Sequence, residues 1–415
     1  MSTAVQKKDP FEALRYPEFR NYVISRLFFI LVINMQATLI QWQVFVLTDD
    51  ALSIGLIGLV EFVPAFFMAF YSGHVIDKSD KRALLMRSIV GNAVLTGILC
   101  FFTSDLAIGR ISQSWLLLII YFVVFGTGIL RAFSGPTSFA LISHLVPKRL
   151  LPNAATWHSG VWQVGAVTGP ALSMLLNASI GITYTFYVML MLMTLAIVGV
   201  YFIKPKPFTG QRREEKFVES IRQGFRFVWR TKEVLGALSL DLFAVLFGGA
   251  TALLPVFAAR ILHVGDEGLG WLRSAPALGS AVILILLTYR PLKKNQGRLM
   301  LMCVAGFGVS IIIFGISDIF WLSMLALFVS GMLDGVSVIV RSTILQLKTP
   351  DEMRGRVAAL NSIFIMSSNE LGSFESGVAA RLLGTVPAVI FGGGMTLAVV
   401  VYTWLKAPTL RKLQY

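Results

Sequence analysis

Long apolar runs, separated by short polar links, fill nearly the whole chain. A helix needs about 20 apolar residues to cross the ~30 Å hydrocarbon layer of a membrane. Twelve runs reach this length, at 19–47, 54–76, 83–104, 114–142, 153–177, 182–203, 234–262, 267–289, 298–316, 320–346, 356–383 and 386–406. Backbone polar groups in lipid must be bonded within their own segment. The pattern therefore predicts an all-α membrane protein with twelve transmembrane helices.

The basic residues are concentrated in every second link between the runs. Of the 36 Lys and Arg residues, 29 lie in the two terminal tails and the even-numbered links, and Arg110 is the clearest exception. Lys and Arg concentrate on the cytoplasmic side of membrane proteins. Both termini are therefore predicted to be cytoplasmic, which agrees with an even number of spans.

The longest polar link divides the spans into two groups of six. We expect an N-terminal half at 1–203, a cytoplasmic linker at 204–232 and a C-terminal half at 233–415. In the linker, Phe217, Ile221, Phe225 and Val228 recur at helical spacing, with arginines on another face. This pattern predicts an amphipathic helix at the membrane surface.

The two halves resemble each other in sequence. A shift of 203 positions places 125–173 on 328–376 with nine identities, so that spans 4 and 5 fall on spans 10 and 11. Similar halves around a central site are the plan of many secondary transporters.

Composition excludes several classes of protein. The chain is 56% hydrophobic and only 14% charged, whereas soluble domains carry about 25% charged residues. The net charge of +14 is explained by the topology, so no nucleic-acid partner is expected. The two cysteines and four scattered histidines predict no metal site, and the chain has no phosphate-binding loop typical of ATP use.

The link after span 2 holds a charged motif, Gly73-His-Val-Ile-Asp77-Lys78-Ser-Asp80-Lys-Arg82. It resembles the signature of the major facilitator superfamily, with Asp80 in place of the usual glycine. In that superfamily the motif latches the two halves on the cytoplasmic side. The resemblance implies a cytoplasmic gate formed by Gly73, Asp77, Lys78 and Arg82. The alternative is a basic loop that only sets topology.

Span 4 carries Arg131 in an apolar run, and its mate in the repeat is Asp334 of span 10. The segment resembles the superfamily's arginine motif of span 4, and spans 4 and 10 line the central cavity in that superfamily. Arg131 and Asp334 are thus candidates for the substrate cavity. The alternative is a structural ion pair that joins the halves.

Span 5 contains Gly165, Gly169 and Pro170. This is a partial match to the helix-5 motif of drug-type antiporters and favours export. The alternative is close helix packing through small residues.

Span 11 is the most polar span, with Asn369, Glu370 and Glu375. A carboxyl group removed from water can take up and release a proton near neutral pH. Glu370 and Glu375, followed by Asp334, are therefore the candidates for proton coupling, with structural pairing as the alternative. Further charges stand within spans and are rarely without function there. We expect three of these charges in the substrate cavity: Arg26, Glu61 and Asp241. Asn369 is expected in the same cavity. The remaining two charges are Arg273 and Arg341.

The chain as a whole resembles the enterobactin-exporter-like branch of the superfamily, also called the transmembrane secretion effector group. The likeness is most specific over 131–170, 239–255 and 334–377. It implies a multi-pass transporter of the bacterial inner membrane that exports siderophores or drugs in exchange for protons.

The sequence thus predicts an alternating-access transporter and no enzyme. The expected cargo is a small amphipathic molecule that leaves in exchange for protons, with the proton gradient in place of a cofactor. We expect a monomer. An importer or lysolipid flippase on the same scaffold is one alternative, and a membrane sensor without transport is another.

Overall fold

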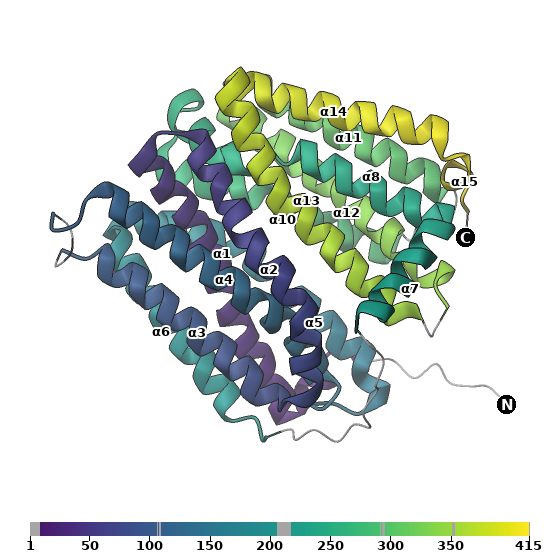
Figure 1. The fold of residues 1–415 in the computed structure, drawn as a ribbon, viewed down its shortest axis with the longest axis horizontal. Coiled ribbons are helices and arrows are strands. Elements are labelled where there is room, and N and C mark those ends of the chain that lie inside the picture. Colours follow the sequence, from purple (N-terminus) through teal and green to yellow (C-terminus); the bar gives the residue numbers. More distant parts are fainter. Residues whose placement is uncertain are drawn as a thin grey trace.

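The structure is a computed structural model, and every regular element in its described part is a helix (Figure 1). It describes residues 9–105, 107, 109–205, 217–290, 292, 295–350 and 353–414, with only the backbone for 217–221. Residues 206–216 of the predicted linker therefore lie outside the described residues.

Each of the twelve apolar runs folds as a helical segment. The first set of helices is α1 Pro17–Thr48, α2 Ala51–Lys78, α3 Lys81–Phe102, α4 Gln113–Ile142, α5 Leu151–Ile180 and α6 Ile182–Tyr201. The second set is α8 Lys232–Gly248, α9 Leu254–Val256, α10 Gly265–Tyr289, α11 Gln296–Ile316, α12 Phe320–Lys348, α13 Arg354–Leu383 and α14 Thr385–Lys406. Helix α7, Phe217–Arg230, precedes the second set, and α15, Pro408–Arg411, follows it.

Ten of these segments are long and apolar enough to cross a membrane, if α8 is counted with its continuation to Ile261. The two others are α5 and α13, which have 30 residues each but more polar sequences. Helix α5 packs on the second set of helices and α13 packs on the first, as described below. Membrane crossing by α5 and α13, and with it the count of twelve, stays a prediction.

Side chains at the loops fix where several helices begin. Asp50 accepts a hydrogen bond from the backbone N–H of Ser53 at the start of α2. Asp80 does the same for Ala83 at the start of α3. Such caps satisfy N–H groups that have no partner within the helix. The aspartate that replaces the superfamily's glycine at position 80 is thus a helix cap.

The predicted span 234–262 is not one continuous helix. Helix α8 ends at Gly248, and a 3-10 turn, the short α9 and a π-turn carry the chain to Ile261. In an α-helix, the backbone N–H of residue 255 would donate to the carbonyl oxygen of Thr251, but Pro255 has no N–H. Two adjacent glycines at 248 and 249 weaken the same stretch, so the break follows from the local sequence.

Each set of helices packs mainly on itself, and two helix pairs join the sets. Helix α2 packs along α13, and α5 packs along α10. Figure 1 shows α2 and α13 side by side at the centre, with α3 and α6 at the margin of the first set and α11 and α14 at the margin of the second. These four helices form most of the seam between the sets.

Buried apolar side chains form two separate cores. We call the end of the bundle that holds Pro17 and Arg411 the terminal end, and the other, near Thr48 and Gly384, the opposite end. One core contains the buried residues of the first set and those of the second set at the opposite end. The other core contains only residues of α7 and the second set near the terminal end. The two sets therefore share a core only toward the opposite end.

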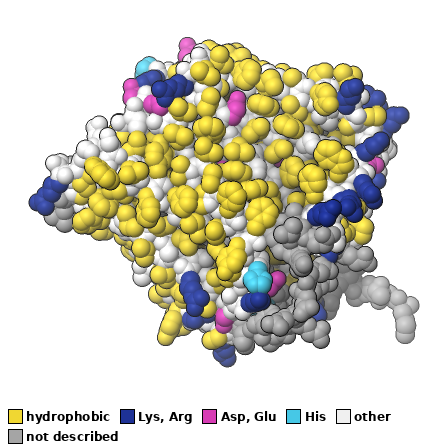
Figure 2. Space-filling view, in the orientation of Figure 1, with side chains coloured by type: hydrophobic (Ala, Val, Ile, Leu, Met, Phe, Trp, Pro, Cys, Tyr) yellow, Lys and Arg dark blue, Asp and Glu magenta, His cyan; other side chains and the backbone are white. Residues whose placement is uncertain are grey.

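The outer surface carries a broad apolar belt. Figure 2 shows hydrophobic side chains over the middle of one face and Lys and Arg gathered toward its edges. Exposed aromatic residues of this kind include Phe67, Phe122 and Tyr187, at 64%, 64% and 54% exposure. Such a belt fits a lipid environment, because large apolar patches are rare on soluble monomers.

Candidate functional site

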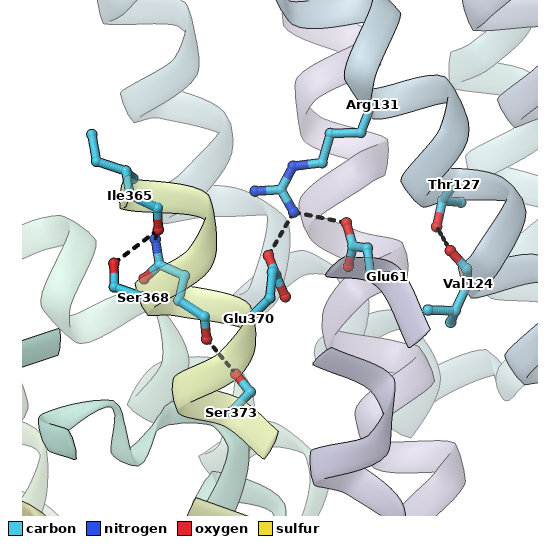
Figure 3. A network of polar contacts seen from close by, with 9 residues as sticks. Glu61, Val124, Thr127, Arg131, Ile365, Ser368, Glu370 and Ser373 are labelled. Atoms are coloured by element: carbon cyan, nitrogen blue, oxygen red, sulfur yellow. Dashed lines mark hydrogen bonds and ion pairs between the residues drawn. The ribbon is translucent and has the colours of Figure 1, made fainter. Parts of the chain in front are cut away.

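An ion-pair network joins the two sets of helices at the middle of the bundle. Arg131 of α4 donates from Nη1 to Oε1 of Glu61 on α2, at 2.7 Å. The same nitrogen donates to Oε1 of Glu370 on α13, at 2.6 Å. Figure 3 shows the guanidinium between the two carboxylates. Arg131 thus links a carboxylate of its own set with one of the other set.

This network borders space that water can reach. The side chain of Arg131 is 47% exposed, while those of Glu61 and Glu370 are 21% and 14% exposed. The Arg131 guanidinium nevertheless stands between Glu61 of α2 and Glu370 of α13 (Figure 3), and all three residues lie away from the ends of their helices. A charge in that position avoids most of its desolvation cost only where water or a partner reaches it.

Arg273 and Gln41 extend the network. The Arg273 guanidinium of α10 donates to the amide oxygen of Gln41 on α1. It also lies within electrostatic reach of Glu370 and Glu61. The centre therefore combines two arginines with two glutamates, and their formal charges balance. The sequence marks Arg273 only as a charge within a span, and nothing there marks Gln41.

Two glycines allow the charged residues to meet. A Cβ at Gly58 of α2 would stand 2.4 Å from the backbone oxygen of Glu370. A Cβ at Gly128 of α4 would stand 2.4 Å from the backbone oxygen of Glu61. Gly331, the repeat mate of Gly128, touches the backbone of Pro276 in the same manner. This repeated identity is thus explained by a close helix crossing in each set.

Two polar side chains close to Glu370 bond their own helix, α13. The Asn369 amide donates to the backbone oxygen of Ile365 at 3.0 Å, and the Ser373 hydroxyl donates to that of Asn369 at 3.0 Å (Figure 3). Asn369 therefore lies beside Glu370 without joining the ion-pair network.

The two remaining proton-coupling candidates lie outside this network. Asp334 of α12 is half-buried and has no hydrogen-bond or ion-pair partner within the described part of the chain. Glu375 is half-buried beside Ser376, more than a helical turn beyond Glu370 on α13. The alternative of a structural ion pair between Arg131 and Asp334 does not hold in this conformation, because the carboxylates that Arg131 bonds are Glu61 and Glu370.

Asp241 is placed inside the second set of helices. Its carboxylate pairs with Arg341 of α12, and the two side chains are only 8% and 5% exposed. Asp334 and Arg341 are seven residues apart on one face of α12, yet the partner of Arg341 comes from α8. Asp241 therefore links α8 to α12, and a place for it in the substrate cavity stays a prediction.

Arg26 belongs to a second polar cluster, within the first set. It donates from Nη1 to Ser138 Oγ at 2.9 Å and from Nε to the backbone oxygen of His158 at 3.3 Å. The Tyr22 hydroxyl lies 2.7 Å from both Ser138 Oγ and His158 Nδ1. This cluster ties α1 to α4 and α5.

The residues of the predicted gate lie at the terminal end of α2 and the start of α3: Gly73, Asp77, Lys78 and Arg82. Asp77 and Lys78 are exposed. Arg82 donates to the backbone oxygens of Val200 and Tyr201 at 3.3 and 3.0 Å. A cation at the last carbonyls of α6 is favourable because of the helix dipole.

The predicted helix-5 motif, Gly165, Gly169 and Pro170, lies on two packing faces of α5. A Cβ at Gly165 would stand 2.6 Å from Ile30 of α1, and a Cβ at Gly169 would stand 2.7 Å from Asn34 of the same helix. On the other face, a Cβ at Gly270 of α10 would meet the backbone oxygen of Pro170 at 3.1 Å. The motif thus packs α5 on α1 and on the other set.

The described residues contain no group of three or more His, Cys, Asp or Glu side chains that could hold a metal ion. A helical bundle with an apolar belt, internal repetition and a charged centre within its helices is typical of membrane transport proteins. The sequence matches the Major Facilitator Superfamily over residues 22–373, with a second match over 249–413. The chain belongs to this superfamily and is a multi-pass membrane transporter, not an enzyme.

Relatives at low identity agree with the resemblance seen in the sequence. The chain is 22% identical to the enterobactin exporter EntS of Citrobacter koseri over 385 residues, which are 92% of this chain and 90% of that protein. It is also 22% identical to EntS of Escherichia coli O1:K1 over 401 residues, 96% and 94% of the two chains.

Solved structures share the fold at still lower identity. A mutant of the nucleoside transporter NupG superposes with a TM-score of 0.74 at 13% identity, over 94% of this chain and 99% of that one. A D-xylose–proton symporter superposes with a TM-score of 0.73 at 12% identity, over 96% and 100% of the two chains. At these identities the likeness shows the fold alone.

Proposed function

We propose that the protein exports a small amphipathic molecule, such as a siderophore, from the cytoplasm in exchange for protons. The curated relatives named enterobactin exporters support export and the siderophore class. The protein would reside in the bacterial inner membrane, and we expect it to act as a monomer. The proposal includes twelve crossings in two six-helix halves, with the terminal end in the cytoplasm as the basic residues predict.

The division of the apolar core supports a conformation that is open to the cytoplasm. The two sets share buried residues only toward the opposite end. There, Arg260 pairs with Asp49, and Arg381 lies 3.8 Å from Asp50, across the two sets. In an alternating-access cycle, this end closes the path to the outside while substrate enters from the cytoplasm.

The observation that carries the proposal is the bond of Arg131 to one glutamate from each set. An ionised Glu370 forms a salt bridge with Arg131, which is stronger than a hydrogen bond from Arg131 to a neutral carboxyl group. A proton on Glu370 removes its charge, so that Arg131 is then paired only with Glu61 of its own set. Proton uptake therefore loosens the link between the halves at the centre, which is what coupling requires. Asp334 and Glu375 are further candidates for the proton.

The proton gradient supplies enough energy for such an exchange. One elementary charge that moves across ~100 mV yields about 2.3 kcal/mol. This sustains a concentration ratio of roughly 50-fold. Gly73, Asp77, Lys78 and Arg82 would form the cytoplasmic gate that closes as the opposite end opens.

The test is transport by the purified protein in vesicles with an imposed pH gradient. We expect enterobactin to move against its gradient when protons flow the other way, and this movement to stop when an ionophore removes the gradient. Movement with the protons identifies an importer. Preference for lysolipid over enterobactin and cationic dyes identifies a flippase. Absence of movement for all of these overturns the proposal and favours a sensor.

A further inference from the structure

Arg26 differs from the other arginines in the middle of the helices. Arg131 and Arg341 each bond a carboxylate, and Arg273 lies near Glu370 and Glu61. Arg26 pairs with no carboxylate of the described residues, and its two hydrogen bonds go to neutral oxygens. An uncompensated arginine within a membrane span costs about 2.5–3.5 kcal/mol on insertion scales. Ionisable residues within membrane spans often mark the path of a substrate or an ion.

A buried network holds the guanidinium from one side. The hydroxyl of Tyr22, which is fully buried, contacts Ser138 and His158, the same two residues that accept from Arg26. The rings of Tyr22 and His158 lie parallel, with centroids 6.2 Å apart. Nε and Nη1 of Arg26 are thereby occupied, and the Tyr22 hydroxyl also lies within hydrogen-bond reach of the guanidinium. The guanidinium is only half-buried, so its accessible side can take a further acceptor.

The cluster lies on the path from the terminal end to the central ion pairs. Ser138 and Arg131 are seven residues apart on α4 and so share one helix face. This spacing corresponds to about 10.5 Å along the helix axis. Ser138 is the nearer of the two to the terminal end, where the two sets have separate cores. A molecule that enters there meets Arg26 before it meets Arg131.

We propose that Arg26 binds an oxyanion of the substrate, a carboxylate or a catecholate, with Tyr22, Ser138 and His158 as positioning residues. The planar guanidinium presents paired N–H donors that match such an anion. This inference rests on the proposed export function and adds the charge of the cargo to it. Because the same site faces the cytoplasmic entry, it selects anionic molecules before proton exchange begins.

The test is equilibrium binding to the full-length protein in nanodiscs, without any pH gradient. The probes are radiolabelled salicylate, which is an anion at pH 7, and salicylamide, its neutral counterpart. We expect salicylate to bind at least tenfold more tightly than salicylamide. Arg26→Gln should abolish this preference and leave salicylamide binding unchanged, whereas Arg110→Gln, which alters an exposed arginine, should preserve it.

A second variant guards against a folding defect. Arg26→Lys retains the charge but lacks the paired donors, and it should weaken salicylate binding severalfold while the protein stays monodisperse. Equal binding of the two probes, or an unchanged preference in Arg26→Gln, overturns the assignment. The outcome is independent of transport: salicylate binding through Arg26 without enterobactin efflux would remove the proposed function and leave the anion site.

Discussion

Gly55 of α2 lies directly against Gly377 of α13. A Cβ at Gly55 would stand 2.9 Å from the Cα of Gly377, and a Cβ at Gly377 would stand 2.8 Å from the Cα of Gly55. Nearly one turn further along α2, Gly58 touches the backbone of Glu370. The glycines thus bring the two backbones together and place Glu370 within reach of Arg131.

Gly58→Ala should impair transport at least fivefold. The added Cβ would meet the backbone oxygen of Glu370 at 2.4 Å, so α2 and α13 must separate. Alanine favours a helix over glycine by about 1 kcal/mol, so a loss cannot arise from helix propensity. The matched control is Gly97→Ala in α3, where a Cβ would meet nothing within 4 Å. Equal activities of the two variants in vesicles would contradict the close contact.

Glu370→Gln should uncouple transport from the proton gradient. Glutamine keeps the shape of the side chain but cannot form the ion pair with Arg131 or exchange a proton. We expect efflux driven by a pH gradient to fall at least tenfold, while exchange of labelled for unlabelled substrate continues. Glu267→Gln, at an exposed glutamate near the opposite end, serves as the control. Full proton-driven efflux by Glu370→Gln would remove this residue from the coupling step.

The sequence was sufficient to locate the helices and the charged residues within them, but it could not show which charged residues pair with one another. Arg131, Glu61 and Glu370 can each be singled out because a charge within an apolar run is rare. Their meeting depends on how α2, α4 and α13 cross, and this is set by Gly58 and Gly128, which resemble many other glycines in the chain. Sequence spacing likewise placed Asp334 and Arg341 on one face, but it could not show that Asp241 takes Arg341.

The amphipathic linker helix shows the same limit. Helix α7 forms as the periodicity predicts, yet Phe225 is 49% exposed whereas Val228 is buried. Phe217 and Ile221 lie outside the described side chains. Gly224 sets the packing face, since it lies against Arg356 and Leu360 of α13. Apolar spacing therefore located the helix and not the side on which it docks.

Asp241→Asn should destabilise the protein strongly. Removal of one partner leaves the buried charge of Arg341 without compensation, at a cost of about 3–5 kcal/mol. The double variant with leucine at both positions removes both charges and should recover most of the loss. The thermal unfolding midpoint in detergent measures both effects. If the single variant melts like the wild type, the pair does not hold α8 to α12.

Asp77→Asn should slow turnover with little change in stability. Asp77 is exposed at the terminal end of α2, so its loss disturbs no buried contact in this conformation. Its proposed role is to stabilise the opposite conformation, in which the cytoplasmic side is closed. In Asp77→Asn the efflux rate should therefore fall while the melting temperature stays the same. Both quantities should remain unchanged in the control Asp105→Asn, which alters an exposed aspartate of the α3–α4 link. A normal efflux rate would reduce the motif to a topology signal.

The two separate cores also determine the order in which the molecule comes apart. Residues near the terminal end of the second set are buried in one core, among them Val234, Val340 and Leu410. A region that completes its own core can open as a cooperative unit of its own. Unfolding is then expected in at least two steps. Backbone amides around Val340 should exchange with solvent together, at a rate different from those of the shared core around Phe257 and Phe314.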